Sequence, residues 1–436
     1  VALTNNGTIN VNAGTLDYVG GTGTSNGTVN LVAGSTWQTD GATMNFASGS
    51  TLSGTGTLLT STGTTNILIP VHTFAGGITL TGGSLVISGA TTLSGAYTQT
   101  GGTLDGAGTL TLTGATNSWS GTIGSWTGGG SVVLSSGAGL TFSGTGNGNI
   151  FAGRTLTINA GATATVSGAI ELDPGTNVIN NAGTFNLTGS GIRHLNGPQG
   201  SLTLTNTGTI NKTGAGTFFL GSSPVAEHVA LTNNGTINVN AGTLDHVGGV
   251  LTQNGLIEVL SGATFSKPGG FTNAAGGMLA GEGTMSVGAG NMLTNDGTVA
   301  PGLTSGDTTG TLAITGNYSQ GAGGTLAMQM DSTAAGNYDQ LVISGSATFN
   351  GTLNLIGAAT SGTFPLVSAA SSTGNFTALT GPIGGNSNYT GTGFSFDIIL
   401  GLFWTGAVDN EWSNPRNWSP GVLPGVSDFI TIGSAG

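Results

Sequence analysis

Internal repetition is the feature that most constrains how this chain can fold. The segment VALTNNGTINVNAGTLDYVGG at 1–21 returns as VALTNNGTINVNAGTLDHVGG at 229–249, with His246 in place of Tyr18 as the single difference. Such near-identity indicates that a long unit was duplicated. Chains built from short repeats fold by stacking one unit on the next, so a repetitive architecture is expected here.

Two shorter motifs recur within the long unit. Neighbouring copies of the first motif, such as those at Gly7 and Gly27, are about 20 residues apart, which fits one solenoid coil per repeat. The first motif is N-x-G-T-[hydrophobic], and it begins at Asn5, Asn206, Asn233 and Asn295, with a variant at Ser25. The second motif is L-x-G-x-G-T-[LM], and it begins at Leu52, Leu104 and Leu279.

Apolar and polar residues alternate with a period of two inside the repeats, as in Thr8-Ile9-Asn10-Val11-Asn12. This alternation is typical of half-buried strands. We expect Leu, Ile and Val to form columns inside and Thr and Asn to form columns outside. Asn-Gly, Ser-Gly and Gly-Gly pairs separate the strands, and we attribute them to tight corners where φ is positive.

The strand pattern leaves a choice between a parallel solenoid and antiparallel sandwiches. Sandwiches would require compact units of about 100 residues with long-range pairing. A solenoid requires only that each coil stack on the previous one, and corner loops can absorb small changes in coil length. The sequence therefore predicts an all-β, parallel β-solenoid built from Gly/Thr/Asn-rich coils of about 20 residues.

Composition excludes several classes of protein. The chain has 5 Lys+Arg against 17 Asp+Glu and a net charge of −12, so it lacks the basic face that binding to nucleic acid requires. No apolar run approaches the length of a membrane-spanning helix, so we expect no membrane insertion. There are no cysteines, which excludes a disulfide framework and thiolate metal sites. The supply of apolar residues argues against disorder.

Residues 299–380 resemble the passenger regions of autotransporter-type proteins. The matching text is VAPGL at 299–303, GTLAITGNYSQGAGGTLAMQM at 310–330 and YDQLVISGSATFNGTLNLI at 338–356. This resemblance implies the last coils of a right-handed parallel β-helix. The Asn-Gly-Thr-Ile repeats are similar to those of filamentous-haemagglutinin-type adhesins, which implies an extracellular protein of the bacterial cell surface.

The last segment is similar to Trp-rich modules that start new β-helical blocks in very large bacterial surface proteins. Its likeness rests on Trp404, Trp412, Trp418, Pro424 and Asp428. We expect the three tryptophans to pack this block rather than to stack on sugars. The predicted organisation is thus solenoid repeats over 1–300, passenger-like terminal coils over 301–400, and the start of a further block over 401–436.

Both ends of the chain lie within repeated sequence, and no polar cap is evident at either end. Open coil ends present unpaired backbone groups. We therefore expect the coils to continue in a longer chain or to associate head to tail with another copy.

Catalysis must be considered because carbohydrate enzymes also use parallel β-helices. Such sites need clustered carboxylates with a cation or calcium. The candidates are scattered in the sequence, so we expect isolated solvent-facing or turn-capping side chains: Asp17, Asp105, Glu171, Asp173, Asp245, Arg154 and Arg193. The prediction is no enzyme, with no catalytic, cofactor-binding or metal site.

Weaker hypotheses concern metals, glycans and ice. His246 replaces Tyr18, a change expected of a tolerant surface position, although His246 could hold a metal with Glu227 and His228. Corner aspartates such as Asp105 could bind calcium weakly, without a defined site. Asn-x-Thr tripeptides match glycosylation acceptors, but corner Asn-Gly explains them more simply. Thr-x-Thr segments suggest an ice-binding face, although they occur irregularly along the chain.

The predicted function is structural and adhesive. We expect a stiff extracellular rod or filament that attaches to a glycan, a host or an abiotic surface, or that assembles into a matrix. The alternatives are a carbohydrate-active lyase or depolymerase on the same fold, marked by clustered carboxylates and a cation on one face, and an ice-binding module, marked by a flat and regular array of threonines.

Overall fold

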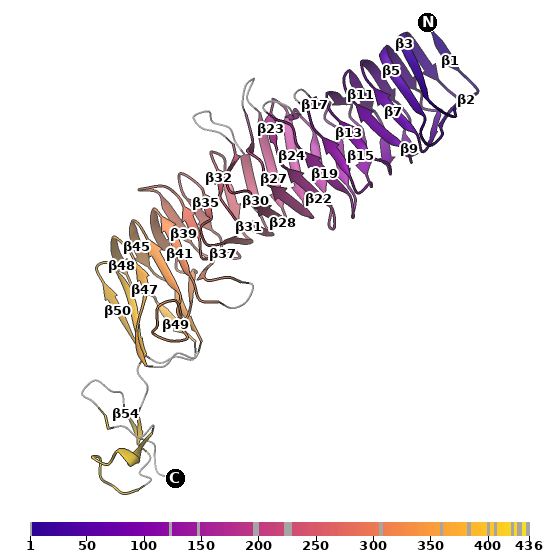
Figure 1. Cartoon of the computed structure of the whole chain (residues 1–436). Helices are drawn as coiled ribbons and strands as arrows, with labels where there is room; N and C mark the ends of the chain where they lie inside the picture. Colours follow the sequence, from indigo (N-terminus) through magenta and orange to yellow (C-terminus); the bar gives the residue numbers. More distant parts are fainter. Residues whose placement is uncertain are drawn as a thin grey trace. The chain divides into compact units, whose positions relative to one another are not determined.

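The structure is a computed structural model that describes the chain except for residues 1, 122–123, 146–148, 195–199, 222–228, 305–307, 358–360, 382–384, 399–401, 405–407, 420–422, 425–429 and 433–436. The chain forms a parallel β-solenoid of about 16 turns, which confirms the predicted fold class (Figure 1). The right-handed sense remains a prediction. By its internal contacts the chain divides into two compact units, Val1–Pro268 and Gly269–Gly436.

Most coils of the first unit contain three short strands, one on each of three faces. The first face contains β7 (Thr57–Thr60), β10 (Gly77–Leu80), β13 (Tyr97–Gln99), β16 (Asn117–Trp119), β19 (Gly139–Phe142), β22 (Thr163–Val166), β25 (Thr184–Leu187), β28 (Thr209–Lys212), β31 (Thr236–Val239) and β34 (Leu256–Val259). Each strand pairs in parallel with its counterpart in the next coil, as in Thr141↔Thr165.

The second and third faces are built in the same way. The second contains β8 (Gly63–Ile67), β11 (Ser84–Ile87), β14 (Gly102–Asp105), β17 (Gly124–Trp126), β20 (Asn149–Phe151), β23 (Ala169–Leu172), β26 (Gly191–Arg193), β29 (Thr217–Leu220), β32 (Thr243–His246) and β35 (Thr264–Ser266). The third contains β9 (Val71–Phe74), β12 (Ala90–Leu93), β15 (Thr109–Leu112), β18 (Ser131–Leu134), β21 (Thr155–Ile158), β24 (Thr176–Asn181), β27 (Ser201–Asn206), β30 (Val229–Asn233) and β33 (Leu251–Gln253).

The N-terminal coils differ at one corner. Two long strands run through the corner between the first and second faces and so contribute to both. Glycines with positive φ, Gly20, Gly21 and Gly41, lie at the midpoints of these strands, where the chain changes direction. The strands of this region are β1 (Leu3–Asn5), β2 (Thr8–Val11), β3 (Thr15–Ser25), β4 (Thr28–Leu31), β5 (Thr36–Phe46) and β6 (Thr51–Gly54), of which β3 and β5 are the long ones.

Aliphatic side chains form columns inside the solenoid, as predicted. On the third face, successive coils place in register five residues that are at most 1% exposed: Leu110, Val132, Leu156, Ile179 and Leu204. Burying each such side chain contributes roughly 1.5–3 kcal/mol relative to exposing it. The interior is therefore stabilised by continuous apolar columns that run from coil to coil.

Asparagine is also found inside, which corrects the expectation that it lies only outside. The first residue of the N-x-G-T motif points inward, and Asn206 and Asn233 are both 0% exposed. Asn181 donates through Nδ2 to Asn206 Oδ1 at 2.7 Å, Asn206 to Asn233 Oδ1 at 2.8 Å, and Asn233 to Gln253 Oε1 at 2.8 Å. Because buried amides are costly unless hydrogen-bonded, stacking identical amides satisfies them inside the solenoid.

The glycine of the N-x-G-T motif has a different role from the one expected. Residues such as Gly14, in the corner that follows, do have positive φ. At Gly27, Gly208 and Gly235, however, the constraint is close approach between coils. A Cβ at Gly235 would lie 2.2 Å from the carbonyl oxygen of Gly208 in the coil before it. In these three copies of the motif, steric contact therefore excludes larger residues.

The second unit holds three parallel ladders and a C-terminal hairpin. The ladders contain β36 (Phe271–Asn273), β39 (Met292–Asn295), β42 (Asn317–Gln320), β45 (Ser346–Phe349) and β48 (Ser371–Gly374); then β37 (Met278–Gly281), β40 (Thr298–Pro301), β43 (Thr325–Gln329), β46 (Thr352–Ile356) and β49 (Ala378–Thr380); and then β38 (Thr284–Ser286), β41 (Thr311–Thr315), β44 (Gln340–Ile343) and β47 (Gly362–Ser368).

The hairpin of β50 (Gly385–Thr390) and β51 (Gly393–Ile398) caps the last coil of this unit. Strand β51 pairs antiparallel with β47, which contradicts the expectation that no cap is present at this end. Aromatic rings pack beneath the hairpin, with Phe376 and Phe394 edge to face at 5.2 Å and Tyr389 at 4.9 Å from Phe394. The hairpin and the rings together cover the apolar interior.

The tryptophans of the last segment pack on one another, as expected. The ring centroids of Trp404 and Trp418 lie 5.1 Å apart, and Trp412 lies 5.5 Å from Trp418. A small sheet contains β52 (Leu402–Trp404), β53 (Trp418–Ser419) and β54 (Ile430–Ile432), and a 3-10 turn, η1 (Pro415–Asn417), precedes β53. Asp428 lies outside the described residues. The predicted boundaries near 300 and 400 follow sequence motifs and remain predictions.

Candidate functional site

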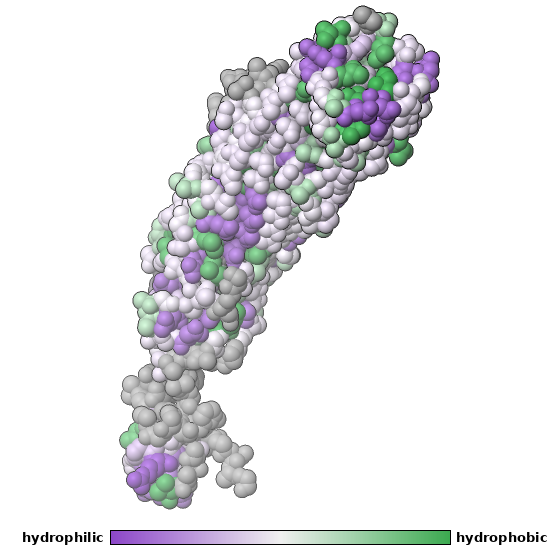
Figure 2. All heavy atoms as spheres, turned by 45° about the vertical axis from the view of Figure 1, so that its right-hand side comes forward, coloured by the Kyte–Doolittle hydropathy of each residue, from purple (hydrophilic) through white to green (hydrophobic). Residues whose placement is uncertain are grey.

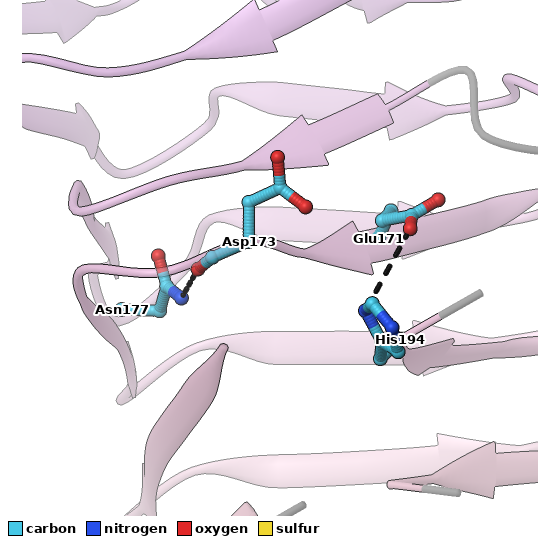
Figure 3. Close-up of polar contacts among 4 residues, drawn as sticks. All are labelled: Glu171, Asp173, Asn177 and His194. Carbon is cyan, nitrogen blue, oxygen red and sulfur yellow. Dashed lines mark hydrogen bonds and ion pairs between the residues drawn. The ribbon is translucent and has the colours of Figure 1, made fainter. Parts of the chain in front are cut away.

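A buried glutamate and its neighbours form the one cluster of potential metal ligands among the described residues. Glu171 lies on β23 and Asp173 directly after it, while His194 follows β26 in the next coil. Figure 3 shows the side chains of Glu171 and His194 directed toward one another. Glu171 Oε1 lies 3.8 Å from His194 Nδ1, and the side chains are 2% and 12% exposed.

Burial and charge shape the electrostatics of this cluster. The pKa of Asp173 is raised above its ordinary value, mainly by partial burial and secondly by the neighbouring carboxylate of Glu171. His194 opposes this rise. Arg193 is in register with Glu171, but its guanidinium lies over the ring of Phe219, 4.7 Å from the centroid. Asn177 anchors the adjacent loop, because its Nδ2 donates to the Asp173 carbonyl at 2.9 Å.

The cluster contains the ligand types that divalent cations use. One ligand atom each from Glu171, Asp173 and His194 lies within 4.8 Å of the others. Carboxylate oxygens and an imidazole nitrogen are ligands of Zn²⁺ and related ions. These three residues are the ones that could hold such an ion.

The expectation that the candidates are scattered is wrong for Glu171, Asp173 and Arg193, which adjacent coils bring together. His194 was not among the sequence candidates at all. The length of one coil places positions 192 and 193 beside positions 170 and 171, so the spacing contained the signal. Asp17 is solvent-exposed, as expected. Asp105 caps a turn, as also expected, because its Oδ1 accepts from Gly106 N at 2.7 Å.

Two further candidates lie inside the solenoid. Arg154 is 0% exposed, and its Nη1 donates to the Thr127 carbonyl at 2.6 Å. Burial lowers the pKa of Arg154 to about 10, while Tyr97 and Asp105 favour its charged form, so it remains a cation at neutral pH. The guanidinium thus satisfies carbonyl groups at a corner of the solenoid.

His246 is 0% exposed, so the expectation of a tolerant surface position is wrong. Its Nε2 lies 2.6 Å from the Val229 carbonyl oxygen and donates to it. Burial lowers the pKa of His246 to about 4, and the charge of Lys267 adds to this effect. Asp245 interacts electrostatically with Lys267. Glu227 and His228, the proposed metal partners of His246, lie outside the described residues.

Hydroxyl groups form a column on the outer side of the third face. Corners of unequal length make the threonines irregular in sequence, yet strand pairing places them in register. We call these residues the third-face column: Thr73, Thr92, Thr111, Val133, Thr157, Asn180, Thr205, Thr232 and Thr252. None of them is charged. Pale residues of intermediate hydropathy likewise dominate the face shown in Figure 2.

No protein-family model matches this chain, and no curated protein matches its sequence. Among the described residues, no helix has the length and apolar character needed to cross a bilayer.

Proposed function

We propose that this chain is a structural and adhesive repeat protein that acts outside the cell, as a stiff rod or filament on a bacterial surface. The observation that carries the proposal is the stacking of coils through buried columns, exemplified by Asn181, Asn206 and Asn233. Each coil is fixed to its neighbours by backbone and side-chain hydrogen bonds and by apolar packing. Such an architecture resists bending because moving one coil breaks bonds to two others.

The resemblance of residues 299–380 to autotransporter passengers and the Asn-Gly-Thr-Ile repeats support the bacterial surface location. The low charge of the chain also suits attachment. With 5 Lys+Arg and 17 Asp+Glu in 436 residues, most of the surface offers hydroxyl and amide groups instead of ions. Binding to such a surface depends weakly on salt, because screening acts on charges.

Attachment of chain-coated beads tests the adhesive role. Beads carrying the 436-residue chain should adhere to glycan-bearing or abiotic surfaces more than albumin-coated beads, and adhesion should change little between low and high salt. Electron microscopy of the purified protein should show elongated particles. Compact particles together with non-adherent beads would overturn the proposal.

Ice binding is a second candidate because of the third-face column. The column places hydroxyl groups on a sheet with strands about 4.8 Å apart, and methyl groups accompany the threonine hydroxyls. An uncharged, regular array of this kind can order water. Inhibition of ice recrystallisation by the purified chain, lost in Thr111→Lys and retained when Asn238 on the first face becomes Lys, would favour this candidate. Ice growth unaffected by the intact chain would eliminate it.

A further inference from the structure

A shallow groove crosses the outer side of the first face in the first unit. It has a volume of about 550 Å³ and spans four successive coils, at strands β13, β16, β19 and β22. Its lining includes Thr98, Ser118, Thr141 and Thr165, one from each of these strands. These four residues are in register, so their hydroxyl groups form a row along the groove.

Small residues create the hollow beside this row. Ala96, Ala115 and Gly139 occupy successive coils at the edge of the groove, where larger side chains would fill it. Gly139 cannot be enlarged, because a Cβ there would lie 2.5 Å from the Ala115 carbonyl oxygen. The groove is therefore fixed by the backbone as well as by the side chains.

Three of the four hydroxyl groups in the row are available to a ligand, and the fourth, Thr165 Oγ1, accepts from Asn186 Nδ2 at 3.5 Å. The hydrogen bonds of the described residues include none that involve the hydroxyls of Thr98, Ser118 or Thr141. Farther along the same face the outward residues bond to one another, with Asn211 Nδ2 donating to Asn186 Oδ1 at 3.2 Å and Asn238 Nδ2 to Asn211 Oδ1 at 3.0 Å. The first face thus changes from self-paired amides, through the contact of Asn186 with Thr165, to the unpaired hydroxyls of Thr141, Ser118 and Thr98.

The chemistry of the lining limits the class of ligand. No charged side chain and no aromatic side chain lines the groove. An acidic polysaccharide would find no cation there, and a free sugar ring would find no stacking platform. Hydroxyls repeated every 4.8 Å or so match an extended chain whose own polar groups recur once per sugar residue.

We propose that this groove binds a neutral, linear oligosaccharide that runs from coil to coil across the four strands. The inference deepens the proposed attachment function and rests on it for its biological meaning. Each hydroxyl donates to one sugar oxygen and accepts from another, and the small residues admit the body of the chain. Affinity arises from several weak contacts along the row, so longer oligosaccharides bind better than shorter ones.

Titration of the purified 436-residue chain with defined oligosaccharides tests the groove. The probes are cellohexaose, xylohexaose, mannohexaose and chitohexaose, with hexagalacturonate as the acidic probe and cellobiose as the short one. At least one neutral hexaose should bind, and hexagalacturonate should not. The double variant Ser118→Ala/Thr141→Val, which keeps the shape of the groove, should weaken binding at least about fivefold, as expected from two lost hydrogen bonds.

A matched variant controls for general damage to the surface. Thr157→Val removes a hydroxyl of the third-face column in the same coils, and it should leave oligosaccharide binding unchanged. An equal loss of oligosaccharide affinity in both variants would overturn the proposed binding site. So would the absence of binding by every neutral hexaose at millimolar concentration. If the beads adhere although no hexaose binds, the oligosaccharide site is rejected and the attachment function is retained. Hexaose binding by a chain whose beads never adhere would support the groove and reject that function.

Discussion

The two copies of the 21-residue repeat occupy different faces of the solenoid. In the first copy, Thr8–Val11 forms β2, which pairs with β4, and β4 pairs in turn with β6. In the second copy the same text, Thr236–Val239, forms β31 on the first face, between β28 and β34. Likewise, TLDY of the first copy contributes to the first face, whereas TLDH of the second lies on the second face.

This difference shows that the strand sequence determines which side chains point inward, and that it does not select a face. Asn5 and Asn233 both point inward and donate to the next coil, to Ser25 Oγ at 2.9 Å and to Gln253 Oε1 at 2.8 Å. Any side of the solenoid offers the same parallel neighbour at the same spacing. The duplicated unit could therefore be inserted without containing a whole number of turns.

The copies also differ in their neighbours. In the part of the chain that the structure describes, Thr236–Val239 pairs with a strand on each side, and Thr8–Val11 pairs with β4. Identical residues should therefore differ in their contribution to stability. Matched substitutions in the two copies measure that difference directly.

The largest effect is expected for Gly235→Ala. The new Cβ would meet the Gly208 carbonyl oxygen at 2.2 Å, so the coils must separate, and we expect a loss of about 3 kcal/mol. Gly7→Ala is the matched control, because no atom lies within 4 Å of its Cβ position. Urea unfolding combined with hydrogen exchange of the local coil measures both. Equal losses at the two positions would show that coil-to-coil contact is not the cause.

Acid should destabilise the second copy through His246. Its pKa is about 4 in the folded chain and about 6.5 when unfolded, so the unfolded chain binds the proton more readily. Stability is therefore lost as the pH falls from 6.5 toward 4, by up to about 3 kcal/mol. His246→Gln can still donate to the Val229 carbonyl but does not titrate. Hydrogen exchange in β32 at pH 7 and pH 4 should show the loss in the parent chain and little of it in the variant.

Removing the inward amide should have a smaller effect that also differs between the copies. Asn233→Ala abolishes the bonds to Gln253 and to the Leu256 carbonyl and removes one of the two acceptors of Asn206 Nδ2, so we expect a loss of about 2 kcal/mol. Asn5→Ala should cost about half as much, because its Oδ1 accepts from the exposed Gly7 N at 3.1 Å instead of from a buried amide. A larger loss of stability at Asn5 than at Asn233, measured by urea unfolding, would contradict the role of the buried amide column.

The smallest effect is expected on the outer side. Asn238→Ala removes a half-exposed bond to Asn211 at 3.0 Å, and the change should stay within about 0.5 kcal/mol. Asn10→Ala in the first copy removes the corresponding bond from Asn30 at 3.3 Å and should behave alike. If either variant lost as much stability as Asn233→Ala, these amides would not be the solvent-facing ones.

The sequence predicts the strands, the inward aliphatic residues and the stacking of coils because these depend on a local period of two and a repeat length. It does not predict that Asn206 and Asn233 point inward, because an isolated polar residue gives no sign that its counterpart in the next coil will satisfy it. The hairpin over β47 was also missed, since its pairing is long-range and follows no repeat.

The cluster at Glu171 was missed for a related reason. Stacking of adjacent coils brings its members together. Asp173 and His194 are separated in the sequence by about one coil, and this spacing is not a recognisable motif. His246 was assigned to the surface because a change from Tyr18 suggested tolerance. The copies lie on different faces, however, so each residue meets a different buried environment, with Trp37 beside Tyr18 and the Val229 carbonyl beside His246.

Engineered disulfides test the parallel, in-register stacking of coils most directly, because the chain has no cysteine of its own. Asn211 and Asn238 are register partners on adjacent strands, and Asn211 and Thr236 are offset by two residues. Neighbouring strands lie about 4.8 Å apart, within the Cα separation that a disulfide spans. Mild oxidation should cross-link Asn211→Cys/Asn238→Cys readily and Asn211→Cys/Thr236→Cys poorly. The reverse preference, or no cross-link in either pair, would contradict the solenoid.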